Sequence, residues 1–164
     1  MEDLKKFYNY FDIEISACSG TKRAEFIKSI KNDLKPCKVV SVKELFNKKQ
    51  IDVMKRIVKQ KECFRNAFQI ADTIWHPDGC IKYVEGRVLV ADFLPIEHAW
   101  NRIGDKYFDA TFELALGKNV DDESYCLLAE YDLNKVRKII LERKYWGEIY
   151  RDEKFKEFYH DKQK

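Results

Sequence analysis

The 164-residue sequence contains few glycines, few prolines and no long apolar run. Its six glycines are scattered and form no phosphate-binding loop of the kind that the common nucleotide enzymes use. No apolar stretch approaches the roughly 20 residues that cross a bilayer. The amino-terminal residues 1–6 also lack the apolar core of a signal peptide. We therefore expect neither a membrane span nor a nucleotide-binding loop.

Cysteine usage excludes a disulfide framework, because the cysteines are odd in number and irregularly spaced. They are Cys18, Cys37, Cys63, Cys80 and Cys126. Without a leader segment, this usage predicts a reducing, cytoplasmic location. His76 and Cys80 have a spacing that two zinc ligands can use, but no second pair follows at a usual distance. We interpret the segment 76–79 as a turn and expect no metal or other cofactor.

Charge of both signs is abundant, with 31 basic and 28 acidic residues and a net charge of +3. Lysines alternate with glutamates and aspartates along helical stretches, which is typical of solvated helix faces. The run 154–164 is basic with interleaved aromatic residues, and we interpret it as an amphipathic terminal helix. The sequence therefore predicts no nucleic-acid partner.

The hydrophobic content of 45% and the aromatic content of 14% supply enough apolar material for the core of one domain. We expect a single α+β domain, 1–164, in three portions. Residues 1–60 form a helical amino-terminal portion, residues 61–132 hold a helix packed on an antiparallel sheet, and residues 133–164 hold a carboxy-terminal helix and tail.

Capping patterns place helices in the first 60 residues. Thr21 is expected to cap a helix over residues 22–34, which Lys35 and Pro36 end. Ser41 and Glu44 have the spacing of a capping box, in which the two side chains satisfy free backbone groups of the first turn. The apolar stripe of this second helix extends to Val58, with an interruption over residues 47–50.

Beyond residue 60 the apolar period changes from helical to alternating. Residues 62–75 predict a third helix, with Cys63 at its amino terminus. Four antiparallel strands are then expected at 81–90, 97–103, 106–112 and 125–131. Asp132 is expected to cap a last helix whose apolar positions are Leu133, Val136, Ile139 and Ile140.

Cys63 lies where a thiol can become a nucleophile. The positive end of a helix dipole and a neighbouring imidazolium both favour the thiolate form. Free N–H groups at a helix start can also bind the oxyanion that forms when a carbonyl is attacked. The amide of Cys63 is one such donor, and Gln60 is a candidate for a second. The alternative is that Cys63 is a small buried residue on an apolar stripe.

A two-residue hairpin turn at Gly104 and Asp105 would fix the register of two strands. Glycine at the first central position suits a type II′ turn. Ile103 would then pair with Lys106, and His98 would lie opposite residue 111 in the next strand.

In this register Asp109 shares a sheet face with His98, as its diagonal neighbour. The carboxylate could then fix one tautomer of the imidazole and leave its other nitrogen to the Cys63 sulfur. A three-residue loop would instead put the two side chains on opposite faces. Taken separately, His98 is also explained as a buried histidine bonded to backbone, and Asp109 as a turn or edge carboxylate.

Four motifs occur in a characteristic order: Cys63 at the head of a helix, Tyr83-Val84-Glu85-Gly86, His98-Ala99-Trp100 and Asp109-Ala110-Thr111. This order resembles the transglutaminase-like branch of the papain-like cysteine enzymes, over about residues 60–115. The resemblance implies the papain-like fold, with Cys63 as nucleophile, His98 as base and Asp109 as the residue that orients the base. The chain differs from the family in having Lys61 where a Gly-x-Cys approach is common, and Ala110 where proline is frequent.

The expected activity is acyl transfer at an amide bond of a peptide or protein substrate, through a thioester. Water as acceptor would make the protein a peptidase, amidase or deamidase, and an amine would make it a transglutaminase. The alternative is a non-catalytic peptide-binding or protein-binding module on the same fold. Trp75 and Trp100 are candidates for walls of the cleft, with a core role expected for at least one of them.

Overall fold

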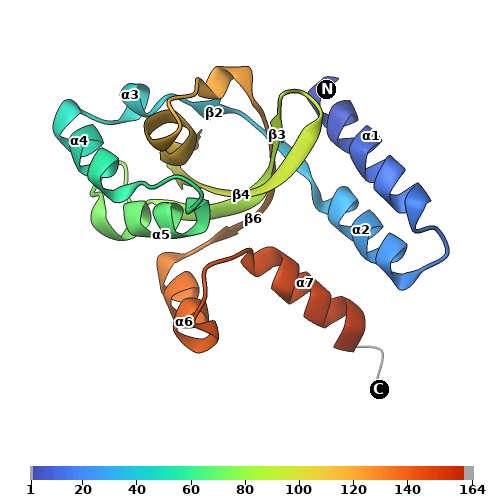
Figure 1. The fold of residues 1–164 in the computed structure, drawn as a ribbon. Helices are drawn as coiled ribbons and strands as arrows, with labels where there is room; N and C mark the ends of the chain where they lie inside the picture. Colours follow the sequence, from blue (N-terminus) through green and yellow to red (C-terminus); the bar gives the residue numbers. More distant parts are fainter. Residues whose placement is uncertain (1, 161–164) are drawn as a thin grey trace.

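The computed structural model describes residues 2–160, which form an α+β structure with a curled six-stranded sheet (Figure 1). The strands are β1 (Lys35–Cys37), β2 (Val39–Val40), β3 (Lys82–Val90), β4 (Leu94–Ile103), β5 (Lys106–Phe108) and β6 (Ser124–Tyr131). The α-helices are α1 (Glu2–Ala17), α2 (Lys22–Asp33), α3 (Val42–Leu45), α4 (Lys48–Ile57), α5 (Cys63–Thr73), α6 (Leu133–Arg143) and α7 (Ile149–His160). Two further turns are the π-helix η1 (Thr111–Ala115) and the 3₁₀-helix η2 (Val120–Asp122).

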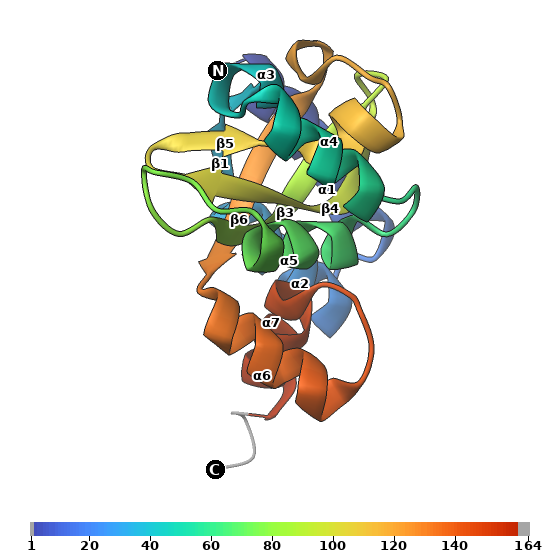
Figure 2. The same ribbon diagram turned by 90° about the vertical axis from the view of Figure 1, so that its left-hand side faces the viewer.

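The sheet is mixed, in the order β1-β6-β3-β4-β5-β2. The antiparallel pairing expected among the four later strands is confirmed, since β3 pairs with both β4 and β6, and β4 pairs with β5. A purely antiparallel sheet is nevertheless wrong, because β2 adds to β5 in parallel. In Figure 1 and Figure 2, α5 lies beside β4, and α6 and α7 lie below α5.

The amino-terminal portion is helical except where β1 and β2 interrupt it. Thr21 caps α2 as expected, its hydroxyl accepting from the Ala24 amide at 3.2 Å. After α2 the chain becomes extended, and these two short strands reach opposite edges of the sheet. The expected end of α2 before Pro36 is confirmed, but the two strands within the helical portion were not predicted from the sequence.

The capping box expected at Ser41 does not form. The Ser41 hydroxyl accepts from the Lys43 amide, and Glu113 of η1 accepts from both the Ser41 hydroxyl (2.6 Å) and the Val42 amide (2.8 Å). A residue distant in sequence thus caps α3. The expected interruption is present, because a true capping box of Asn47 and Gln50 begins α4.

The strand expected over residues 106–112 is shorter than the sequence pattern indicated. The pairing of β5 with β4 ends at the pair Asn101 and Phe108, and the π-helix η1 follows at Thr111. An Asp109 carboxylate oxygen accepts from the Phe112 amide at 3.1 Å, which turns the chain away from the sheet. Thr111 therefore lies in η1 and is not the ladder partner of His98.

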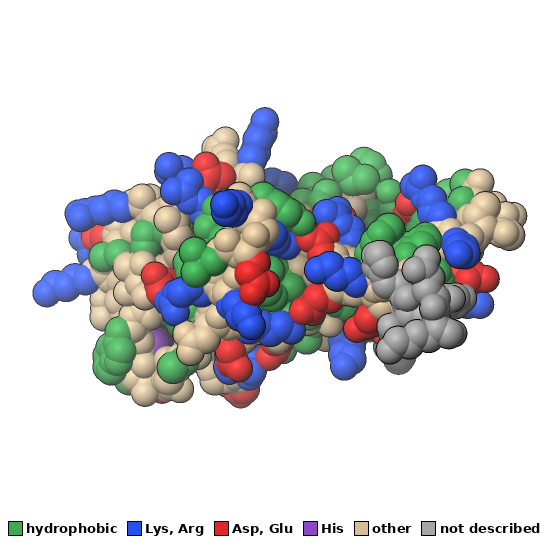
Figure 3. All heavy atoms as spheres, turned by 90° about the horizontal axis from the view of Figure 1, so that it is seen from below, with side chains coloured by type: hydrophobic (Ala, Val, Ile, Leu, Met, Phe, Trp, Pro, Cys, Tyr) green, Lys and Arg blue, Asp and Glu red, His purple; other side chains and the backbone are tan. Residues whose placement is uncertain are grey.

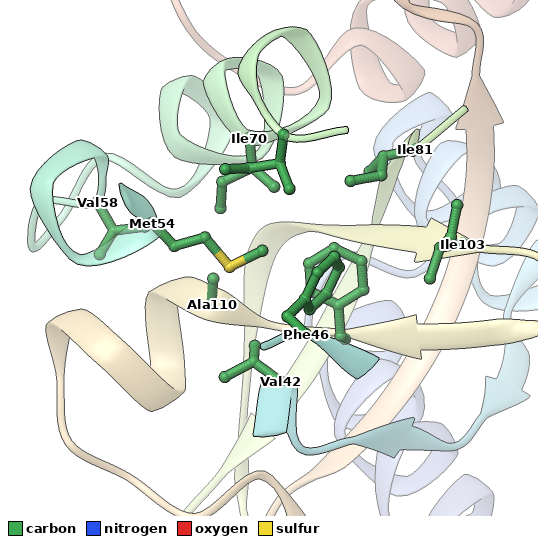
Figure 4. Packing of buried hydrophobic residues seen from close by; sticks show 10 residues of the cluster. Val42, Phe46, Met54, Val58, Ile70, Ile81, Ile103 and Ala110 are labelled. Atoms are coloured by element: carbon green, nitrogen blue, oxygen red, sulfur yellow. The ribbon is translucent and has the colours of Figure 1, made fainter. Parts of the chain in front are cut away.

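The helix α5 is held to the sheet by an apolar cluster (Figure 4). Ile70 of α5 and Met54 of α4 point toward Ala110 and Phe46, with Ile103 of β4 at the other end of the cluster. Burial of each such side chain contributes about 1.5–3 kcal/mol. The cluster thereby fixes the helix that carries Cys63 against the strand that carries His98.

The carboxy-terminal portion contains two described helices, α6 and α7. Asp132 precedes α6, but its side chain makes no capping bond because it contacts Lys82. The terminal helix expected in the run 154–164 overlaps α7, which begins earlier, at Ile149, and lacks a clear apolar stripe; residues 161–164 lie outside the described residues. Basic and acidic side chains are interspersed over the face that Figure 3 shows. None of the helices in residues 2–160 combines the length and apolar character that a bilayer span requires.

Candidate active site

Cys63 is the first residue of α5 and is half-buried. The carboxylate of Glu62, at the preceding N-cap position, accepts no capping hydrogen bond from a backbone amide of the first turn; it accepts instead from the Arg65 guanidinium at 3.1 Å. Within the described chain, the helix start therefore keeps backbone donors that its own N-cap does not use. Free N–H groups at a helix start, together with the helix dipole, can bind an anionic group.

Two buried asparagines hold this helix in place. Asn66 exchanges hydrogen bonds with both backbone groups of Lys59, at 2.7 and 3.0 Å, and donates to the Thr111 hydroxyl at 3.1 Å. Asn101 of β4 donates to the Ala67 carbonyl of α5 at 2.8 Å. The first contact orders the approach to Cys63, and the second ties α5 to the histidine strand. The sequence interpretation included neither residue.

The backbone just before the cysteine is left-handed. Lys61 has a φ of 63°, a conformation that side chains with a Cβ rarely adopt. Lys61 precedes Cys63 by two residues, and only glycine adopts this conformation without strain. The chain thus has at Lys61 a backbone conformation suited to glycine.

His98 and Asp109 are in direct contact, as the hairpin register predicted. Nε2 of His98 lies 2.6 Å from Oδ2 of Asp109, and the two residues are 3% and 0% exposed. The turn has the expected form, with Gly104 at a φ of 57° and Ile103 paired with Lys106. Only the expected length of the second strand is wrong, since Asp109 lies one residue beyond its end.

Asp109 accepts three hydrogen bonds. His98 and the Tyr125 hydroxyl (3.0 Å) both approach Oδ2, while the Phe112 amide donates to Oδ1. Such convergence stabilises the charged carboxylate in a buried site. Tyr125 comes from β6, and the sequence interpretation did not include it, because no local pattern connects it to Asp109.

Aromatic rings enclose this pair. The Phe112 ring lies edge-on to His98 with ring centroids 4.9 Å apart, and Trp100 stacks on His98 at 6.1 Å. Trp100 is 1% exposed and so belongs to the core, while Trp75 is 75% exposed. Of the two candidate cleft walls, Trp100 thus has the expected core role.

Charges around His98 favour its imidazolium form. Burial alone would lower the pKa of His98, but the Asp109 carboxylate and a hydrogen bond with the Cys63 side chain outweigh it and raise this pKa to about 10. Because Nε2 faces Asp109, Nδ1 is the ring nitrogen that remains for Cys63. The structure thus brings together all three residues selected from the sequence.

The other residues selected from the sequence, Gln60 and His76, make contacts outside the Cys63, His98 and Asp109 group. The Gln60 amide nitrogen donates to the Ala115 carbonyl at 3.1 Å, so this amide is engaged with η1. His76 uses both ring nitrogens, one with the Leu45 carbonyl and one with the Asp78 amide. Among the described residues no group of acidic, histidine or cysteine side chains is arranged to hold a metal ion. His76 is therefore a structural residue of the expected turn.

A cavity of about 270 Å³ adjoins the start of α5. Its lining residues are Lys61, Glu62, Phe64, Arg65 and Trp146. The Trp146 ring packs against Phe68 with centroids 5.3 Å apart. Trp146 reaches this place from the loop between α6 and α7, which sequence patterns near Cys63 do not reveal.

No family model, curated protein or solved structure matches this chain.

Proposed function

We propose that the protein is a cysteine-dependent acyl transferase or hydrolase acting on amide bonds of a peptide or protein substrate. Cys63 would be the nucleophile, His98 the general base and acid, and Asp109 the residue that orients His98. The observation that carries this proposal is the buried contact of His98 with Asp109 at 2.6 Å, together with the interaction of His98 with the Cys63 side chain. We further propose that the fold is of the papain-like, transglutaminase-like type.

In the first step, the Cys63 thiolate attacks the amide carbonyl carbon and forms a tetrahedral intermediate. The new oxyanion would be bound by free N–H groups at the start of α5, including that of Cys63. His98, already an imidazolium, gives a proton to the leaving amine as the carbon–nitrogen bond breaks. A thioester on Cys63 results, with His98 neutral.

In the second step, His98 removes a proton from the acceptor as it attacks the thioester, which returns the thiolate and the imidazolium. Water as acceptor gives hydrolysis, and an amine gives transamidation; both acceptors fit the same residues. Asp109 keeps its negative charge throughout and stabilises the imidazolium. The mechanism requires Cys63 in reduced form, and none of the five cysteines forms a disulfide within the described residues, so we also propose a reducing, cytoplasmic location.

A non-catalytic binding module is the alternative function. The observation that favours it is the cavity beside α5, which Phe64 and Trp146 wall with aromatic surface. Such a cavity could hold an apolar side chain of a peptide without any reaction at Cys63.

Selective alkylation distinguishes these functions. Iodoacetamide reacts only with the thiolate form of cysteine, and the proposed mechanism pairs a Cys63 thiolate with the His98 imidazolium. At pH 6 this reagent should therefore label Cys63 at least about tenfold faster than the exposed Cys80. His98→Ala should abolish the difference. Profiling peptide amides with the wild-type protein would then identify the substrate. Equal rates at Cys63 and Cys80 would contradict the enzyme and favour the binding module.

A further inference from the structure

We propose that Tyr125 is a positioning residue of this site, whose hydroxyl holds the Asp109 carboxylate in its orientation toward His98. This inference rests on the proposed function in one respect, namely that the Asp109–His98 pair serves Cys63. The placement of the hydroxyl itself follows from the structure alone.

The first support is the shared oxygen. The Tyr125 hydroxyl lies 3.0 Å from Oδ2 of Asp109, the same oxygen that His98 approaches at 2.6 Å. The other oxygen accepts from the Phe112 amide at 3.1 Å. Backbone and Tyr125 therefore hold the carboxylate from two sides, and its remaining freedom to rotate away from the imidazole is removed.

The second support is the absence of room for solvent to replace this hydroxyl. Tyr125 is 4% exposed and Asp109 is 0% exposed. The Tyr125 ring lies edge-on to Trp100 at 5.4 Å and to Phe112 at 6.2 Å between centroids. A buried carboxylate that loses a donor in such surroundings recovers no bond from water, so its charged form is disfavoured.

The third support is the direction of donation. Burial, followed by the charge of Asp109, raises the pKa of Tyr125 above its ordinary value. The hydroxyl therefore keeps its proton and can only donate to the carboxylate. A donor on this oxygen makes the carboxylate a weaker proton acceptor, so the proton of His98 stays on the imidazole ring.

The titratable groups around Tyr125 do not replace this role. They are Asp109 and His98, together with Glu123 before β6 and Cys37 on β1. Burial raises the pKa of Cys37 to about 12, so this thiol is neutral at ordinary pH. Glu123 pairs with Lys118 at 3.3 Å. Tyr125 is thus the side-chain hydroxyl bonded to Asp109 in the described chain.

The test is Tyr125→Phe, which removes one oxygen and keeps the ring. Tyr131→Phe is the matched control, because Tyr131 is also buried on β6 and its hydroxyl donates to another carboxylate, Glu153, at 3.1 Å. Two measurements are made on wild type and both variants. One is the pH dependence of the His98 ring resonances by NMR, and the other is the pH dependence of Cys63 alkylation by iodoacetamide.

In Tyr125→Phe, the inflection of the His98 resonances should move by about one pH unit, because the Asp109 oxygen that faces His98 loses a hydrogen-bond donor. The rate of Cys63 alkylation at acid pH should fall about tenfold relative to wild type. Tyr131→Phe should leave both curves at their wild-type positions. The melting temperature of each variant should fall, because each loses one hydrogen bond of a buried tyrosine.

An unmoved NMR inflection in folded Tyr125→Phe would overturn the positioning role, as would an equal movement in Tyr131→Phe. Failure of the proposed function gives a different pattern. In that case wild-type Cys63 reacts no faster than Cys80, while the NMR inflection still decides whether Tyr125 controls the Asp109–His98 pair.

Discussion

His98 and Asp109 meet at 2.6 Å although one belongs to β4 and the other follows β5. A two-residue turn at Gly104 and Asp105 places the two strands in the required register. The carboxylate is fully buried, so its interaction with the imidazole is little screened by solvent. This relationship organises the proposed chemistry.

Replacement of the nucleophile should abolish turnover without unfolding the protein. Cys63→Ala removes one half-buried sulfur and should lower the free energy of unfolding by about 1 kcal/mol or less. Amide turnover should fall to background, because no other group can form the thioester. Cys80→Ala, at an exposed position, should retain full activity. Turnover by folded Cys63→Ala would exclude the proposed mechanism.

Replacement of the orienting carboxylate should affect rate far more than substrate binding. Asp109→Asn keeps the shape but loses the charge that stabilises the imidazolium, so kcat should fall on the order of 10³-fold with little change in KM. Steady-state kinetics on a profiled peptide substrate measure both constants. Asp105→Asn, at the exposed turn, should leave both unchanged. A similar loss in the two variants would contradict a specific role for Asp109.

Protein stability should fall as pH rises from about 6.5 to about 10. The pKa of His98 is raised above its ordinary value of 6.5 to about 10 in the folded state. The contribution of protonated His98 to the free energy of unfolding is therefore complete below pH 6.5 and is lost as the pH rises through about 10. Urea unfolding of wild type and His98→Ala across this range measures the contribution. The wild type should lose more stability than the variant; parallel curves would contradict the raised pKa.

A side chain at Gly86 should disrupt the site by contact alone. A Cβ there would lie 2.1 Å from the Cys126 carbonyl oxygen and 2.6 Å from the Trp100 ring. Gly86→Ala should therefore cost about 3 kcal/mol or more. Gly104→Ala has open space around it but a left-handed φ, and should cost only about 1 kcal/mol. Urea unfolding compares the two, and equal costs would show that the sheet adjusts at Gly86.

The left-handed backbone at Lys61 should tolerate glycine and reject branched residues. Lys61→Gly relieves about 1 kcal/mol of strain but increases the freedom of the unfolded chain, so stability should stay within about 1 kcal/mol of wild type. Lys61→Val should lose about 1–2 kcal/mol more than the glycine variant, because a β-branched residue is least compatible with this φ. Thermal unfolding of the pair measures this difference, and a reversed order of stability would contradict it.

Local patterns in the sequence were sufficient to predict several parts of the site. The start of α5 at Cys63, the hairpin turn at Gly104 and the contact between His98 and Asp109 each depend on residues close in sequence. A turn type and an alternation of faces determine strand register without reference to the rest of the chain. The order of these residues carried the resemblance, whose functional meaning remains a proposal.

The tertiary structure decided what local patterns do not contain. The end of β5 depends on the Asp109 side chain bonding the Phe112 amide, and the cap of α3 depends on Glu113, some 71 residues away from Val42. The parallel addition of β2 is likewise a pairing between distant segments.

The side chains that surround the catalytic candidates also come from segments distant in sequence. Tyr125 reaches Asp109 from β6, and Trp146 reaches the start of α5 from a loop beyond α6. The sequence by itself determined which chemically able residues occur at a helix start and on one face of a hairpin. Only the tertiary structure decided which distant side chains surround them, because burial and shared hydrogen bonds depend on the packing of the whole chain.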